Sequence, residues 1–184
     1  MLIEVRWHGR GGQGVVTVSR LLAYAALLDG KYVQAFPEFG PERRGAPVTG
    51  YTRISDEPIR IHSYIYNPDI VVVVDPTIMG SIDVTKGLAE NGIIVANTEK
   101  SPEDLKSQLG AEKAKVYTVN AVRIALDILG RPIYNTAMLG ALIKASSLVT
   151  LDSLSRVVKE RFPGAIGEKN VAVIKRAYEE ARGI

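Results

Sequence analysis

Near its start the sequence has a glycine-rich segment whose composition suits the binding of a phosphate group. Residues 9–14 read Gly-Arg-Gly-Gly-Gln-Gly, so four of the six positions are glycine. Glycine lets the backbone come close to a ligand, because it has no Cβ. The spacing of Gly9, Gly11 and Gly14 matches the dinucleotide-binding pattern G-x-G-x-x-G. The candidate ligand-binding residues in this segment are Gly9, Arg10, Gly11, Gly12 and Gln13.

The segments on either side place these glycines between a strand and a helix. Residues 2–8 form a short run rich in strand-forming residues. Apolar residues then recur at helical spacing over residues 15–28, until Asp29-Gly30 ends the element. The N-terminus of such a helix has unpaired amides and a positive dipole end, so it favours an anion. We expect a crossover to a parallel strand to follow this helix.

The second half of the dinucleotide pattern is missing. An acidic residue is expected at the end of the next strand, about 20 residues on, to hold a ribose hydroxyl. The run 31–36 ends instead in Phe36, and Glu38 lies beyond a proline. This absence counts against a free-standing NAD- or FAD-binding protein. A second alternative is that the glycines serve only a tight turn and close helix–strand packing.

A second candidate segment, residues 36–47, carries charges on an irregular loop. Its twelve residues include three prolines and two glycines, which exclude regular secondary structure. The loop leaves the carboxyl end of the predicted second strand, the edge where ligands bind in doubly wound sheets. We therefore expect it to share a crevice with the glycine loop; a solvated charge cluster is the alternative. The charged residues of this loop are Glu38, Glu42, Arg43 and Arg44.

Composition narrows the class of protein. The 184 residues suit one domain, residues 1–184, and the hydrophobic content of 46% is enough for a core. A net charge of only +3 does not indicate a nucleic-acid-binding surface. No apolar run reaches about 18 residues, and no signal-peptide pattern opens the chain, so we expect a cytoplasmic protein that does not bind a membrane.

Residues for catalysis or metal binding are scarce. The chain has no cysteine, which excludes a disulfide, a thiolate metal site and an iron–sulfur cluster ligated by this chain. His8 and His62 are the only histidines, and neither belongs to a metal-binding or triad pattern. Arg6, His8 and Arg10 alternate along the first strand and should share one face. We interpret His8 as a satisfied, unreactive histidine.

The elements that position the candidate residues indicate an α/β fold. Val48–Ile54 and Ile59–Ile61 read as a hairpin, which predicts a mixed sheet rather than an all-parallel one. The β-branched run at 70–74 predicts a central strand, with Val71 to Val74 at its centre. Asp75 ends this run, where it caps the next turn or faces the crevice.

Alternation of helices and strands continues to residue 129, and the remainder is helical. The prediction is a single Rossmann-like three-layer domain with a mixed, mostly parallel sheet and a helical C-terminal third. The strands expected in this part are Ile93–Asn97 and Val116–Val119. The helices expected are Ile82–Glu90, one opened by Ser101-Pro102, one from Asn120 to Leu129, Thr136–Leu148, Leu151–Arg161 and Glu168–Arg182.

Two long motifs resemble the gamma subunit of pyruvate:ferredoxin oxidoreductases. They are RWHGRGGQGVV at residues 6–16 and FPEFGPERRGAPV at residues 36–48. The resemblance runs nearly end to end, with shorter matches at residues 53–56, 67–69, 135–136 and 139–141. It implies a subunit of a complex that oxidatively decarboxylates a 2-oxoacid on thiamine diphosphate, passes electrons through [4Fe–4S] clusters to ferredoxin, and releases an acyl-CoA.

The resemblance also implies how the cofactors are divided. Without cysteines or a thiamine diphosphate motif in this chain, thiamine diphosphate, Mg and the [4Fe–4S] clusters are expected on the alpha, beta and delta subunits. The share implied for this chain is CoA, with Arg43 or Arg44 supplying charge and Glu38 or Glu42 orienting them. The charged loop alternatively packs against the thiamine-binding subunit. Gamma subunits of branched-chain 2-oxoacid enzymes carry similar motifs, so the substrate stays open.

Overall fold

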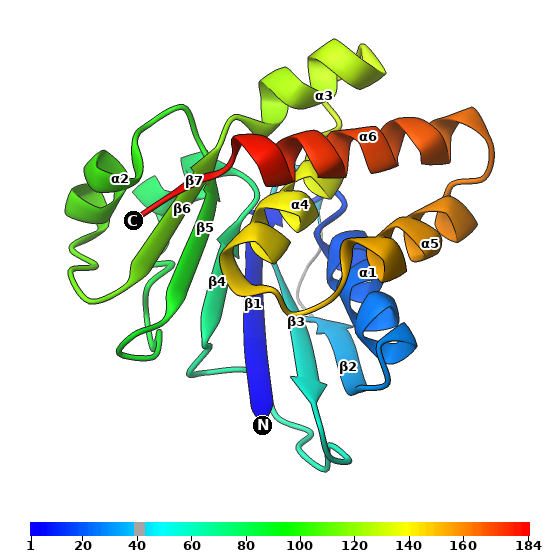
Figure 1. Cartoon of the computed structure of the whole chain (residues 1–184). Coiled ribbons are helices and arrows are strands. Elements are labelled where there is room, and N and C mark those ends of the chain that lie inside the picture. The colour runs from blue at the N-terminus through cyan, green and yellow to red at the C-terminus, as the bar shows by residue number, and fades with distance from the viewer. Residues whose placement is uncertain (39–42) are drawn as a thin grey trace.

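A seven-stranded sheet, in the order β2-β3-β1-β4-β5-β6-β7, runs through the molecule (Figure 1). The computed structural model describes residues 1–38 and 43–184. The strands are β1 Leu2–Arg10, β2 Tyr32–Pro37, β3 Pro47–Ser55, β4 Ile70–Val73, β5 Ile93–Asn97, β6 Lys115–Val119 and β7 Arg182–Gly183. The helices are α1 Val15–Leu28, the 3-10 helix η1 Pro76–Gly80, α2 Pro102–Leu109, α3 Ala121–Leu129, α4 Asn135–Ser146, α5 Leu151–Arg161 and α6 Ala165–Glu180.

The sheet is mixed, as predicted. β1, β4, β5 and β6 are parallel neighbours, whereas β3 and β7 run antiparallel to the strands beside them. β2 runs in the same direction as β1, with β3 between them, so the crossover through α1 leads to a parallel strand that is not adjacent. The prediction of a central strand is also confirmed, because all four residues of β4 are buried.

The predicted hairpin of Val48–Ile54 with Ile59–Ile61 is wrong. The first segment belongs to β3, but residues 59–61 form no strand. Both edges of β3 are already paired, with β1 along Leu2↔Ser55 and with β2 along Tyr32↔Ser55, so no edge is left for a further strand.

The predicted helix Ile82–Glu90 is also wrong, since residues 81–90 form turns. The Asp83 carboxylate accepts hydrogen bonds from the amide and hydroxyl of Thr85, an arrangement that competes with helix formation. The Arg6 guanidinium binds the carbonyls of Val84 and Lys86, which a helix would need for its own hydrogen bonds. These contacts hold the segment as turns that cover Arg6.

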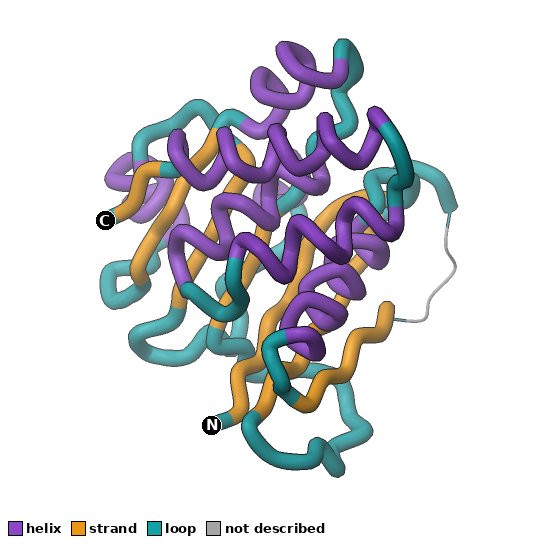
Figure 2. The backbone as a smooth tube through the Cα atoms, turned by 45° about the vertical axis from the view of Figure 1, so that its right-hand side comes forward, coloured by secondary structure: helices purple, strands orange, loops and turns teal. Residues whose placement is uncertain are grey.

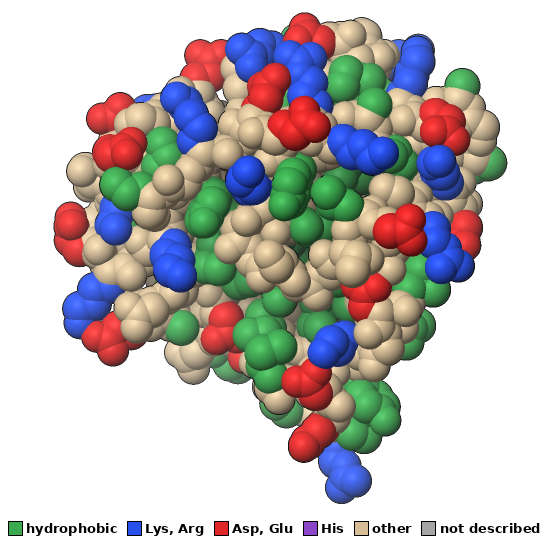
Figure 3. Space-filling model, viewed as in Figure 1, with side chains coloured by type: hydrophobic (Ala, Val, Ile, Leu, Met, Phe, Trp, Pro, Cys, Tyr) green, Lys and Arg blue, Asp and Glu red, His purple; other side chains and the backbone are tan. Residues whose placement is uncertain are grey.

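Two hydrophobic cores lie on opposite faces of the sheet and give the predicted three layers. Helices α1, α4, α5 and α6 cover one face (Figures 1 and 2), where Trp7 and Val72 belong to the larger core. On the other face, Val71 and Val73 pack with Leu105 of α2. Lys and Arg side chains are interspersed with Asp and Glu over the helix-covered face (Figure 3).

The C-terminal third is helical, with one departure at its end. α4, α5 and α6 match the predicted helices to within three residues at each end. α6 stops at Glu180, because Ala181 is extended, and the short β7 then joins the edge of β6. Within the described residues, no helix is long and apolar enough to cross a membrane.

Candidate functional site

The glycine loop connects β1 to α1, and all four of its glycines are required by geometry. A Cβ on Gly11 would lie 2.6 Å from the backbone oxygen of Arg43. Gly12 and Gly14 have φ angles of 89° and 74°, a conformation that residues with a Cβ rarely adopt. A Cβ on Gly9 would lie 2.3 Å from Cγ2 of Val15, and one on Gly14 would lie 2.3 Å from Nδ2 of Asn135. The loop is therefore shaped by close packing against α1 and the start of α4.

The described end of the second loop, residues 43–46, packs directly on the glycine loop. The Gly11 amide donates to the Ala46 carbonyl at 2.8 Å, and the Gly45 amide donates to the Gly11 carbonyl at 3.1 Å. Nη1 of Arg10 donates to the Gly45 carbonyl at 3.2 Å. The prediction that the two loops reach the same edge of the sheet is confirmed for these residues. Glu42 lies outside the described residues.

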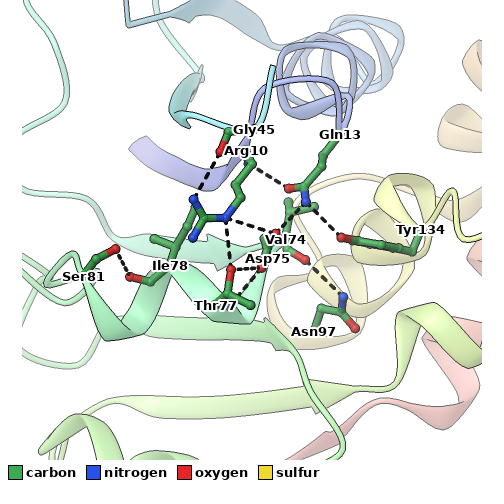
Figure 4. A network of polar contacts seen from close by, with 10 residues as sticks. All are labelled: Arg10, Gln13, Gly45, Val74, Asp75, Thr77, Ile78, Ser81, Asn97 and Tyr134. Atoms are coloured by element: carbon green, nitrogen blue, oxygen red, sulfur yellow. Dashed lines mark hydrogen bonds and ion pairs between the residues drawn. The ribbon is translucent and has the colours of Figure 1, made fainter. Parts of the chain in front are cut away.

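Gln13 fixes the loop from within (Figure 4). Its Oε1 accepts a hydrogen bond from the Arg10 amide at 2.7 Å. Its Nε2 donates to Asp75 Oδ2 at 2.6 Å and to the Tyr134 hydroxyl at 3.1 Å. The side chain of Gln13 thus ties the loop to the end of β4 and to the residue before α4.

Asp75 both caps a helix and touches the crevice, so the two predicted roles coexist. It accepts hydrogen bonds from the Thr77 amide at 2.9 Å and the Thr77 hydroxyl at 2.7 Å, which caps η1. Nε of Arg10 lies 3.6 Å from Oδ2 of Asp75. Burial raises the pKa of Asp75, but hydrogen bonds from Thr77 and Gln13 and the charge of Arg10 outweigh it. The pKa therefore lies below its usual value, and the carboxylate is ionised.

The groups that remain available to an anion lie around Gly12. The Gly11 and Gln13 amides are used internally, the second by the Arg10 carbonyl at 3.1 Å. Gly12 is exposed, and its amide has no hydrogen-bond partner among the described residues. The Arg44 side chain lies beside Gly12, with Cγ 3.7 Å and Nε 3.9 Å from where a Cβ on Gly12 would stand.

Two further features make this corner attractive to an anion. α1 begins without a side-chain cap, so the amides of its first turn have no such partner. Arg43 and Arg44 are exposed and form no ion pair with any described residue. Glu38 forms no ion pair with either arginine, and its carboxylate accepts a hydrogen bond from the Tyr51 hydroxyl at 2.8 Å. An exposed glycine with an unpaired amide, an uncapped helix and two arginines fit a phosphate or pyrophosphate group.

His8 is a satisfied, buried histidine, as predicted. It is only 5% exposed, and its Nε2 accepts a hydrogen bond from Nε of Arg6 at 3.0 Å. Burial and the neighbouring charge of Arg6 lower the pKa of His8 to about 4, so the ring is neutral at pH 7. No group of three or more His, Asp or Glu residues that could hold a metal ion occurs within residues 1–38 and 43–184.

Tyr134 and Asn135 also belong to this site, although their spacing in the sequence does not indicate it. Each contacts the glycine loop across a sequence separation of 121 residues, Tyr134 through Gln13 and Asn135 through the Gly14 carbonyl at 3.4 Å. No local periodicity predicts such a contact. The only indication in the sequence is that Asn135-Thr136 is one of the short motifs that resemble the gamma-subunit family.

Comparison with known proteins places the chain in one family. The family model described as pyruvate ferredoxin/flavodoxin oxidoreductase matches residues 4–180. The pyruvate/ketoisovalerate oxidoreductases common subunit gamma of Pyrococcus furiosus is 55% identical over 97% of each chain. The pyruvate synthase subunit PorC of Methanothermobacter marburgensis is 51% identical over 98% of each chain.

A solved structure of a third related protein supports the same family assignment. The crystal structure of the pyruvate oxidoreductase subunit PORC of Thermotoga maritima superposes with a TM-score of 0.89 at 41% identity, and covers 99% of this chain and 98% of its own. The chain therefore belongs to the pyruvate ferredoxin/flavodoxin oxidoreductase family, as one of its gamma subunits.

Proposed function

We propose that the chain works as the gamma subunit of a multisubunit 2-oxoacid:ferredoxin oxidoreductase, together with alpha, beta and delta subunits and with ferredoxin as the electron acceptor. In this reaction the 2-oxoacid loses carbon dioxide, its acyl carbon is transferred to the CoA thiol, and the electrons released reduce ferredoxin. Pyruvate is the first candidate substrate and a branched-chain 2-oxoacid the alternative, in line with the names of the relatives.

The redox and decarboxylation chemistry is assigned to the partner subunits. The chain has no cysteine to ligate an iron–sulfur cluster. It also has no described cluster of acidic or histidine ligands for a metal ion. Thiamine diphosphate, Mg and the [4Fe–4S] clusters thus belong on the partners, and the isolated chain is inactive.

The share assigned to this chain is the pyrophosphate of CoA. The observation that carries the assignment is the Arg44 side chain beside the exposed Gly12, two residues before the uncapped N-cap position of α1. Gly12, the first turn of α1, Arg43 and Arg44 contact the phosphates, because these groups present unpaired donors and positive charge. Gly9, Arg10, Gly11 and Gln13 hold the loop in shape through the packing and hydrogen bonds described above. Binding here would orient the CoA thiol toward the thiamine-bearing partner.

Titration of CoA into the assembled complex tests the assignment. Arg44→Ala removes a charge-assisted contact worth about 1.5–3 kcal/mol, so CoA affinity should fall roughly ten- to a hundredfold, and by more at low salt than at high salt. Arg60→Ala, at an exposed arginine beyond β3, is the matched control and should leave affinity unchanged. An unchanged dissociation constant in Arg44→Ala, measured calorimetrically on an intact complex, rules out the assignment.

A second candidate role is that of a scaffold whose glycines are purely structural. It is favoured by the clashes that a Cβ would cause at Gly9, Gly11 and Gly14, each of them with protein atoms. In that case the charged loop docks on the thiamine-binding subunit. Arg44→Ala should then weaken assembly of the complex, while CoA affinity of the complex that does form stays normal.

A further inference from the structure

β2 is the end strand of the sheet, and its outer edge pairs with no strand in the part of the chain that the structure describes (Figure 1). The Glu38 amide donates to the Thr49 carbonyl opposite it at 2.9 Å. Because hydrogen-bonded pairs alternate in an antiparallel ladder, the even-numbered residues of β2 bond to β3. The amides and carbonyls of Val33 and Ala35 therefore point away from the sheet. None of these groups has a hydrogen-bond partner among the described residues.

This edge lacks the usual protection against pairing with another chain. Exposed edge strands commonly carry a charged side chain, often a lysine, because it discourages such pairing. The run Tyr32–Pro37 has no charged residue. Pro37 has no amide to donate, but it lies at the end of the strand, beyond Ala35. Two outward-facing residues, Val33 and Ala35, are thus open to a strand of another chain.

A second copy of the same chain fits this edge in one register. In an antiparallel pairing centred on Gln34, Val33 of each copy lies opposite Ala35 of the other. All the outward amides and carbonyls of these residues are then hydrogen-bonded. A pairing centred on Ala35 would place Val33 opposite Pro37, which has no amide. A pairing centred on Val33 would place Ala35 opposite Lys31, whose amide already donates to a carbonyl of α1 at 3.0 Å.

The side chains beside the edge also suit a second copy. Val33 packs against the core beneath α1, so Tyr32 and Phe36 point to the opposite face of the sheet. In the register centred on residue 34, Tyr32 would meet Phe36 of the second copy, and Tyr32 is 49% exposed in the single chain. On the α1 face, Leu27 and Leu28 at the end of that helix are 55% and 45% exposed. Aromatic and aliphatic pairs across a ladder stabilise it.

The charges at the two ends of β2 are complementary. Lys31 directly precedes the strand, and Glu38 directly follows it. Antiparallel pairing puts the start of one strand beside the end of the other, so Lys31 of each copy comes near Glu38 of the other. The centre of the pairing is the uncharged Gln34, so no like charges face each other there. This pattern of charges favours the antiparallel arrangement.

We propose that two copies of this subunit associate through their β2 edges, about a two-fold axis at Gln34, and so join their sheets into one. A two-fold contact of this kind uses the same surface of both copies. A strand of a different subunit is the alternative occupant. A second copy fits better, because each outward backbone group and each end charge finds its partner within the same sequence. The proposal is independent of the CoA assignment, since the paired residues lie outside the glycine loop and residues 43–46.

Disulfide cross-linking tests the register directly, because the chain has no cysteine of its own. Residues 34 of two copies would form a non-hydrogen-bonded pair with Cα atoms about 4.5 Å apart, a separation that a disulfide spans. Gln34→Cys should therefore give a covalent dimer on mild oxidation of the purified chain. Tyr32→Cys, on the same face and more exposed, is the matched control. Residues 32 of two copies would lie about 13 Å apart, so this variant should remain uncross-linked. Equal cross-linking of the two variants, or none in either, overturns the proposal.

Sedimentation of the purified chain gives a measurement that needs no cysteine. At tens of micromolar, the wild-type chain should sediment at about twice the 20.0 kDa of one copy. Ala35→Pro removes an outward amide that the fold does not use, so it should sediment as a monomer with an unchanged circular dichroism spectrum. Ile133→Ala, at an exposed residue between α3 and α4, is the control and should stay dimeric. A monomeric wild-type chain, or a folded Ala35→Pro chain that stays dimeric, contradicts the proposal. If Ala35→Pro does not fold, the cross-linking comparison decides.

Discussion

Gln13 joins three separate parts of the molecule through one side chain. Its amide group contacts the Arg10 backbone, the Asp75 carboxylate and the Tyr134 hydroxyl. Side-chain amides suit this task because one oxygen accepts while the nitrogen donates twice. The residue therefore holds the glycine loop in place, and its effect on any ligand is indirect.

Removing this side chain should destabilise the fold. Gln13→Ala leaves the Arg10 amide and one Asp75 oxygen without these partners, and the free energy of unfolding should fall by about 1–3 kcal/mol. Chemical denaturation of the purified chain measures this. Gln108→Ala, at an exposed glutamine on α2, is the control and should cost less than about 0.5 kcal/mol. Equal stabilities of the two variants would contradict the role given to Gln13.

His8 makes stability depend on pH in a defined window. Its pKa falls from 6.5 to about 4 on folding, so between these values the unfolded chain binds a proton that the folded chain lacks. The free energy of unfolding therefore rises by about 3 kcal/mol as the pH increases across this window. The same amount of stability is lost as the pH falls from 6.5 toward 4.

Denaturation curves recorded from pH 4 to pH 7 test this prediction. His8→Gln should flatten the pH dependence in that window, because the variant has no imidazole to protonate. His62→Gln replaces an exposed histidine and should keep the wild-type slope. A slope in His8→Gln as steep as that of the wild type would show that other groups cause the acid sensitivity.

At the scale of elements, α4 and α6 pack so closely at Gly140 that no side chain fits between the two backbones. A Cβ on Gly140 would lie 2.1 Å from the Ile174 carbonyl oxygen, so the helices meet backbone to backbone at this point. Gly140→Ala should force them apart and lower the free energy of unfolding by about 1–3 kcal/mol. Gly80→Ala is the control, since a Cβ there meets no atom within 4 Å. A melting temperature lowered equally in both variants would refute the close-packing argument.

Elements with local signals were predictable, and elements decided by distant contacts were not. Ser101, Asn120 and Gly130 begin or end helices where predicted, because each acts on backbone groups within its own turn. The position of β3 between β2 and β1 depends on two pairings across the sheet. The turns at residues 81–90 depend on Arg6, about 80 residues away.

At the scale of the whole molecule, the site lies where segments far apart in sequence meet at the carboxyl ends of the strands. The glycine loop and the described end of the second loop, residues 43–46, could be placed there from the sequence, because each loop follows an early strand. The contacts of Tyr134 and Asn135 could not, since they require the C-terminal helices to return over α1.

The central claim is that CoA binds at the glycine loop of this chain. Amide hydrogen exchange, measured on the assembled complex with and without CoA, tests it most directly because it locates the protected amides. CoA should slow exchange over residues 12–17 and leave α2, on the opposite face of the sheet, unchanged. Saturating CoA that leaves the exchange of residues 12–17 unaltered, while amides of another subunit become protected, would contradict the account.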